Sequence, residues 1–277
     1  MIPPSESWAI QVETTTKCPR RCSNCTRMVA HSGDIHMEPE VFRRAVESVL
    51  EFPSLSPPNK YVNMPSKCIG IIGGEPRKHP QFEALRQTMI ELLPNRMHRG
   101  LWTGLRLTDD LERDFGIINH NMHKGVVQHQ PILVASRELM PDPVIRRAWT
   151  SKCWLNHRWS PMISLTGQVF LCEVGATLDR LFKLNLGLPL ETHWWTWPLE
   201  AFQEQIDQLC SRCGVACPLP ARIDREGIDD ISLDNLQELR EVGGFDDSRC
   251  VVFDCTNYNP ANHLDGWEPA RYIKGGG

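Results

Sequence analysis

Three cysteines in one short loop are the residues whose type and spacing most clearly indicate chemistry in this chain. The segment KCPRRCSNCTR places them as Cys18-x3-Cys22-x2-Cys25. Zinc sites more often use C-x2-C pairs and four ligands. Three thiolates in a compact loop suit three irons of a cubane cluster, and the open fourth iron can take a substrate or cofactor. We therefore predict an iron–sulfur cluster here, with a zinc or structural cysteine loop as the alternative.

A glycine-containing turn follows the next apolar segment. The sequence KCIGIIGGEP (67–76) has the pattern of a buried strand that ends in Gly73-Gly74-Glu75-Pro76. Glycines allow a backbone to approach a ligand closely, and a carboxylate can accept a hydrogen bond from an ammonium group. We expect this turn to contact the same ligand as the cysteine loop.

The cysteine loop and the glycine turn, in this order, resemble the motifs of the radical S-adenosylmethionine (SAM) superfamily. The resemblance implies that Cys18, Cys22 and Cys25 hold a [4Fe-4S] cluster whose open iron binds SAM. Reductive cleavage of SAM would then yield methionine and a 5′-deoxyadenosyl radical, which abstracts hydrogen from a substrate. Family members commonly have an aromatic residue, packed against the adenine, where this chain has Asn24.

The same resemblance implies further contacts to SAM. The turn residues Gly73, Gly74, Glu75 and Pro76 are expected to bind it. Later strands of the fold should contribute as well, and the candidates at their ends are Thr103 and Asn119.

A second set of cysteines lies further along the chain. Cys153 and Cys172 flank a Gly167 in a C-x13-G-x4-C pattern, and Cys210-x2-Cys213 follows. Four thiolates without an evident vacancy indicate a fully ligated, electron-transferring cluster. Whether Cys217 is also a ligand stays open on the sequence alone. The isolated cysteines are expected to be small buried hydrophobic residues; they are Cys68, Cys250 and Cys255.

This arrangement resembles the auxiliary-cluster extensions of radical SAM enzymes, called SPASM and twitch domains. The longer SPASM form continues as C-x2-C-x5-C-x3-C, whereas this chain has C-x2-C-x3-C after residue 209. The resemblance is therefore to the shorter twitch form, which implies a second, auxiliary [4Fe-4S] cluster.

The elements that must position these cysteines follow an alternating pattern. Strands are expected at 8–15, 67–73, 99–105, 116–121 and 131–136, and helices at 37–52, 79–93 and 107–115. Such alternation predicts an α/β fold with a parallel sheet, which binds ligands at the carboxyl ends of its strands.

The resemblance implies a partial (β/α)6 TIM-like barrel over residues 1–150. A hairpin that turns at Thr166-Gly167, followed by a helix, would form a small twitch/SPASM-like subdomain over 151–222. Residues 223–277 are expected to be a tail of mixed structure.

Composition excludes several classes of protein. The chain has 277 residues, with 30 Lys and Arg against 34 Asp and Glu, so no basic field for nucleic acid is expected. We see no signal peptide or membrane span and expect a cytoplasmic protein without a membrane partner. Eleven cysteines, an odd number, therefore favour metal binding over disulfides.

Together these features predict a radical SAM oxidoreductase. It would dehydrogenate a small polar metabolite, with the auxiliary cluster as electron acceptor and a flavodoxin- or ferredoxin-type protein as electron donor. The sequence does not identify the catalytic base. Two alternatives remain: a maturase that modifies a peptide or protein, and a non-catalytic iron–sulfur electron-transfer protein.

Overall fold

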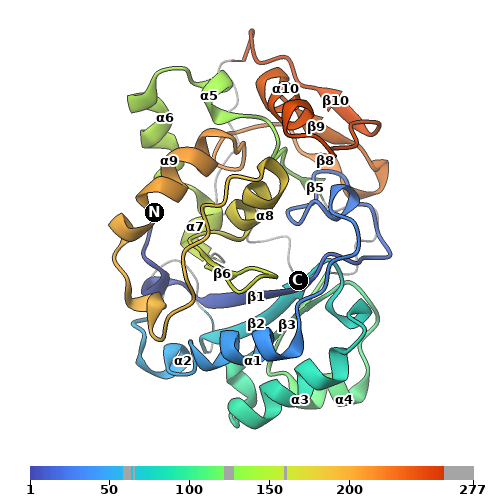
Figure 1. The fold of residues 1–277 in the computed structure, drawn as a ribbon, viewed down its shortest axis with the longest axis vertical. Helices are drawn as coiled ribbons and strands as arrows, with labels where there is room; N and C mark the ends of the chain where they lie inside the picture. Colours follow the sequence, from blue (N-terminus) through green and yellow to red (C-terminus); the bar gives the residue numbers. More distant parts are fainter. Residues whose placement is uncertain (59–63, 65, 122–127, 159–160, 259–277) are drawn as a thin grey trace.

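The computed structural model describes residues 1–58, 64, 66–121, 128–158 and 161–258. Its centre is a six-stranded sheet with the order β4-β3-β2-β1-β6-β7 (Figure 1). Adjacent strands run parallel except for the last pair, in which β6 and β7 are antiparallel. The strands are β1 Ala9–Thr15, β2 Cys68–Gly73, β3 Arg99–Thr103, β4 Ile117–His120, β6 Met162–Ile163 and β7 Val169–Phe170. The protein is thus a mixed α/β fold, consistent with a partial TIM-like barrel.

The strands at the centre of the sheet are buried on both faces. Every residue of β1 and β2 is buried. This explains the apolar sequence of β2, whereas β1 also carries buried polar side chains at Gln11, Glu13, Thr14 and Thr15. Parallel pairing places the carboxyl ends of β1, β2 and β3 at one edge of the sheet. The segments that follow these strands carry the cysteine loop and the glycine turn.

Helices cover the sheet on both faces (Figure 1). One group lies below the sheet in that view: α1 Pro39–Glu47, α2 Phe52–Leu55, α3 Phe82–Leu92 and α4 Asp109–Asp114. A second group lies above it: α5 Ser136–Leu139, α6 Pro143–Thr150, α7 Trp154–Arg158, α8 Glu173–Phe182 and α9 Gln203–Ser211. Short 3₁₀ turns join these elements at Pro4–Glu6, Val29–His31, Pro76–Lys78, Arg96–His98, Trp194–Thr196, Leu199–Phe202 and Asp224–Glu226.

Two predicted elements differ from the structure. The helix expected over 37–52 is divided: α1 ends at Glu47, residues 48–51 form a turn, and α2 begins at Phe52. Pro53 lies in the first turn of α2, where its missing N–H costs no helical hydrogen bond. The strand expected over 131–136 does not form. Leu133 makes a single parallel bridge with Ile231, and Ser136 begins α5.

The predicted hairpin is confirmed at its described residues, with Gly167 in the left-handed region at φ 79°. Its strand β6 pairs with β1, so the hairpin extends the main sheet. The division of the chain at residue 150 stays a prediction, although strands from both sides of that residue form one sheet.

The C-terminal part folds beside the cysteine loop (Figure 1). It contains β8 Arg222–Ile223, β9 Asp229–Ile231, α10 Leu233–Val242 and β10 Cys250–Val252. Strand β8 pairs with β5 Gln128–His129, and β9 pairs in parallel with β10. Part of the predicted tail, residues 259–277, lies outside the described residues.

The hydrophobic core accounts for the tryptophan-rich segment. Trp194 and Trp195 are buried in the core cluster, and Trp197 packs against it. Their role is therefore to fill the core. No helix within the described ranges is both long and apolar enough to span a lipid bilayer.

Candidate active site

The cysteine loop begins where β1 ends, and the glycine turn holds this point. Gly74 N donates to Thr15 O at 2.6 Å, and Glu75 N donates to Lys17 O at 2.8 Å. These two backbone hydrogen bonds tie the end of β2 to the first residues of the loop. The two motifs, about fifty residues apart in the sequence, are thus directly joined.

The glycine pair is required by this backbone contact. A Cβ atom at Gly73 would lie 2.3 Å from Thr15 O, and one at Gly74 would lie 2.5 Å from Lys17 O. Both distances are far below van der Waals contact. The close approach predicted for these glycines is therefore, in this structure, an approach to the chain's own backbone.

The Glu75 carboxylate faces β3. Its Oε1 accepts from Thr103 Oγ1 at 2.7 Å, and its Oε2 accepts from Gly104 N at 2.8 Å. Glu75 is buried, and both of its oxygens already accept a hydrogen bond. This pairing fixes the turn to the end of the neighbouring strand and brings Thr103 beside it.

These motifs line one cavity of about 230 Å³, which we call the three-thiol cavity. All the residues expected from the sequence to surround the first cluster are present except Pro76: Cys18, Cys22, Cys25, Gly73, Gly74, Glu75, Thr103 and Asn119. Pro76 is buried beside the cavity, in the turn that follows Glu75.

Two arginines of the loop supply positive charge at the three-thiol cavity. Arg20 donates to Asn121 O and to Gly104 O, which anchors the loop to the ends of β3 and β4. Arg27 is buried and lies 2.9 Å from Glu13 of β1. Cations near clustered thiolates offset their negative charge, so this setting suits an anionic group.

Burial makes the loop cysteines neutral thiols in the metal-free protein. It raises the pKa of Cys18 to about 11 and that of Cys22 to about 12, and it also raises the pKa of Cys25. Because metal ligation needs thiolates, metal binding here must release protons.

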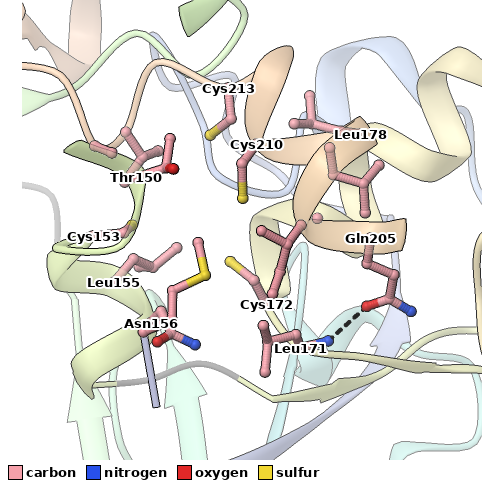
Figure 2. Close-up of a pocket in the computed structure, with 16 residues that line it drawn as sticks. Thr150, Cys153, Leu155, Asn156, Leu171, Cys172, Leu178, Gln205, Cys210 and Cys213 are labelled. Atoms are coloured by element: carbon pink, nitrogen blue, oxygen red, sulfur yellow. Dashed lines mark hydrogen bonds between the residues drawn. The ribbon is translucent and has the colours of Figure 1, made fainter. Parts of the chain in front are cut away.

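The second set of cysteines lines a separate cavity of about 40 Å³, which we call the four-thiol cavity. Cys153, Cys172, Cys210 and Cys213 all contribute to its wall (Figure 2). The sulfur atoms of Cys172 and Cys210 face each other across it.

Three different elements supply these four thiols. Cys153 directly precedes α7, Cys172 is the N-cap of α8, and Cys210 and Cys213 lie at the end of α9. Gln205 of α9 connects two of these elements, because its Oε1 accepts from Leu171 N at 2.9 Å (Figure 2). The rest of the wall is mostly aliphatic, which raises the pKa of each thiol by burial.

Thiolates are the usual protein ligands of iron–sulfur clusters, and each cavity carries a set of cysteines. Three thiols in one cavity and four in the other therefore match the predicted chemistry by type and number.

The two cavities share a wall. Leu155 lines both of them, while its neighbours divide between the two. Cys153 and Cys172 line the four-thiol cavity. The residue after each of them, Trp154 and Glu173, lines the three-thiol cavity. A redox group in one cavity would thus lie close to a substrate in the other.

Several residues of the three-thiol cavity were not predicted from the sequence. They include Asn121, His129, Trp154 and Glu173. Burial raises the pKa of Glu173, opposed by Arg27 and by a hydrogen bond from Gln11. Trp154 and Glu173 directly follow the predicted ligands Cys153 and Cys172. That position was the one sequence signal that either residue lies near a site.

The remaining cysteines do not line either cavity. Cys68 is buried in the core, as expected. Cys217 is buried among Val134, Leu139 and Leu219, and burial raises its pKa to about 12. Cys250 and Cys255 are only partly buried, so the expectation of buried residues is wrong for these two.

Comparison with known proteins yields little. No protein-family model matches the chain, and no curated protein matches it. One solved structure to which this chain is similar is described as BtrN in complex with AdoMet and 2-DOIA. It shares 14% identity, covers 74% of this chain and 92% of its own chain, and superimposes with a TM-score of 0.42.

Proposed function

We propose that this protein is a radical SAM oxidoreductase. The observation that carries the proposal is the three-thiol cavity, in which both sequence motifs of that superfamily meet. A protein that only transfers electrons does not need the second motif, the glycine turn that is expected to bind SAM. Cys18, Cys22 and Cys25 would hold a [4Fe-4S] cluster, and the rest of the cavity would hold SAM. When bound, these groups supply a 5′-deoxyadenosyl radical that abstracts hydrogen from a substrate.

The residues around the cavity would orient SAM and substrate. The backbone of Gly73 and Gly74 forms part of the wall, and Glu75 locks this turn against Thr103. Asn119, at the end of β4, adds an amide to the same wall. Polar side chains thus surround the ligand space, which fits a small polar metabolite as the substrate.

An auxiliary [4Fe-4S] cluster in the four-thiol cavity would make the reaction an oxidation. Loss of a hydrogen atom leaves a substrate radical; loss of a proton and one electron then yields the oxidised product. The shared wall of Leu155, Trp154 and Glu173 supports this assignment, because it separates an electron acceptor from the substrate by few side chains. A flavodoxin- or ferredoxin-type protein would supply the electron that cleaves SAM.

Anaerobic reconstitution with iron and sulfide tests the proposal. We expect about eight irons per chain and dithionite-dependent formation of 5′-deoxyadenosine from SAM. About four irons with intact cleavage would remove the auxiliary cluster from the proposal. Bound iron without any cleavage would favour the electron-transfer alternative, and a protein that binds only zinc would overturn both.

A further inference from the structure

Asn24, the position at which the chain departs from the superfamily pattern, is bound by the C-terminal part. It lies between Cys22 and Cys25, is fully buried, and has a left-handed backbone with φ 48°. Asparagine is among the residues that adopt this conformation most readily. The backbone of the loop therefore favours asparagine at this position on local grounds alone.

The side chain of Asn24 pairs reciprocally with Asp230 of β9. Asn24 Nδ2 donates to Asp230 Oδ2 at 3.0 Å, and Asp230 N donates to Asn24 Oδ1 at 2.9 Å. In addition, Asn24 N donates to Asp229 Oδ1 at 2.6 Å. The amide is thus directed to β9, and the backbone and side chain of one loop residue hold two consecutive aspartates.

Both aspartates in turn contact basic side chains. Asp229 Oδ2 lies 2.8 Å from His31 Nε2 and 2.8 Å from Arg249 Nε. Asp230 accepts two hydrogen bonds from Arg222, at 2.7 and 2.8 Å. Bidentate, charge-assisted pairs of this kind fix orientation strongly.

The same region holds the loop at two more points. Arg249 Nη2 donates to Arg21 O at 3.1 Å and to Cys22 O at 3.2 Å. Ser23 N donates to Asp224 O at 2.9 Å, and Ser23 Oγ accepts from Ile228 N at 3.2 Å. Both residues between Cys22 and Cys25 are therefore anchored about 200 residues away in the sequence.

We infer that Arg222, Asp229, Asp230 and Arg249 form a clamp that positions the thiols of Cys22 and Cys25 through Asn24. The clamp acts through the loop, so its members are positioning residues. The inference rests on the proposed function, in which these thiols hold a cluster. Residues that orient metal ligands contribute about 10- to 100-fold to metal affinity in other proteins.

The test measures iron loss from the loop cluster alone. The full-length chain carrying Cys172→Ala and Cys210→Ala, which lacks the auxiliary ligands, is reconstituted anaerobically and mixed with a ferrous chelator. Asn24→Ala and Asp230→Asn should each accelerate iron loss about tenfold. Asp234→Asn is the matched control: it makes the same change four residues further on, at an exposed carboxylate, and should leave the rate unchanged.

A paired substitution separates a specific contact from general destabilisation. Asn24→Asp alone places two carboxylates against each other and should lose iron fastest. Combined with Asp230→Asn, the new amide can donate to the new carboxylate, so the double variant should retain iron longer than Asn24→Asp. If the double variant lost iron as fast as Asn24→Asp, the clamp would be overturned.

Further outcomes distinguish the clamp from the proposed function. If the unsubstituted protein binds no cluster, the proposed function and the clamp both fail. If it binds a cluster but does not cleave SAM, only the proposed function fails, because the rate of iron loss still tests the clamp. If it cleaves SAM while Asn24→Ala loses iron no faster than the Asp234→Asn control, only the clamp is wrong. An unchanged electron paramagnetic resonance signal of the reduced loop cluster in Asn24→Ala would also contradict the clamp.

Discussion

Cys172 and Glu173 are consecutive residues that line different cavities: Cys172 the four-thiol cavity, and Glu173 the three-thiol cavity. Cys172 caps α8 from an extended backbone conformation, so the side chains leave the chain on opposite sides. Cys153 and Trp154 are likewise consecutive, and they line the four-thiol cavity and the three-thiol cavity, respectively. The chain thereby places the four-thiol cavity next to the three-thiol cavity, in which the proposed reaction would occur.

This arrangement predicts a division of labour between the two sets of cysteines. Cys18→Ala should abolish SAM cleavage, because it removes a ligand of the cluster that would bind SAM. Cys172→Ala should retain some cleavage but stop formation of the oxidised product. Iron content and 5′-deoxyadenosine, measured together on each variant, test this; equal behaviour of the two variants would contradict it.

Gly74→Ala should misplace the cysteine loop. The new Cβ would lie 2.5 Å from Lys17 O and 2.7 Å from Thr16 O, both backbone atoms that cannot turn away. We expect a loss of about 1–3 kcal/mol in the free energy of unfolding, measured by urea denaturation.

Gly175→Ala in α8 is the matched control. Its Cβ would lie 3.2 Å from a methyl group of Leu209 and 3.7 Å from Cys172 Cβ, both side-chain atoms, and alanine favours a helix over glycine by about 1 kcal/mol. A similar loss of stability in both variants would show that the backbone contact at Gly74 is not the cause.

Glu13→Gln should be strongly destabilising. Glu13 is fully buried and bridges Arg27 at 2.9 Å and Arg180 at 2.8 Å. Although burial opposes its ionisation, the two arginines hold the pKa of Glu13 below its ordinary value. Its neutral replacement leaves two largely buried cations uncompensated, at a cost of about 3–5 kcal/mol in the free energy of unfolding.

Glu91→Gln provides the comparison for Glu13. Glu91 forms an exposed pair with Arg43, and such pairs contribute little to stability. Chemical denaturation of both variants should therefore give a large loss for Glu13→Gln only. Equal losses would mean that Glu13 is not needed to stabilise the charges of Arg27 and Arg180.

The free energy of unfolding should decrease as the pH is lowered below about 6.5, the ordinary pKa of histidine. His79 is one source of this decrease. Its Nε2–H donates to Met37 O at 2.8 Å, and its Nδ1 accepts from Gln81 N at 3.0 Å, so the folded state holds the neutral ring. Burial lowers the pKa of His79. The unfolded chain then binds the extra proton first, and acid favours unfolding.

His79→Gln isolates this contribution. Urea unfolding at pH 7.5 and at pH 5.5 should show a smaller difference in the variant than in the unsubstituted protein, whatever the absolute stability of the variant. An identical pH dependence in the two proteins would exclude His79 as a source of the effect.

Local patterns in the sequence were enough to predict most of the helices and strands and the grouping of the cysteines into two sets. Alternation of apolar segments predicted β1 to β4 and α3, and Thr166-Gly167 predicted the hairpin. These features depend on residues near one another in the chain, so spacing and turn chemistry are enough to indicate them. Pro53 was also a local signal, because proline favours the first turn of a helix, and the predicted helix over 37–52 did not allow for a separate α2 beginning at Phe52.

Only the tertiary structure decided which residues meet. It assigns the thiols to two cavities with a common wall, and it directs Asn24 to Asp229 and Asp230. It also leaves 131–136 without a strand, because the C-terminal segment satisfies its backbone: Ser232 N donates to Leu133 O. Contacts between residues 100 to 200 positions apart follow from packing and burial, which no local pattern encodes.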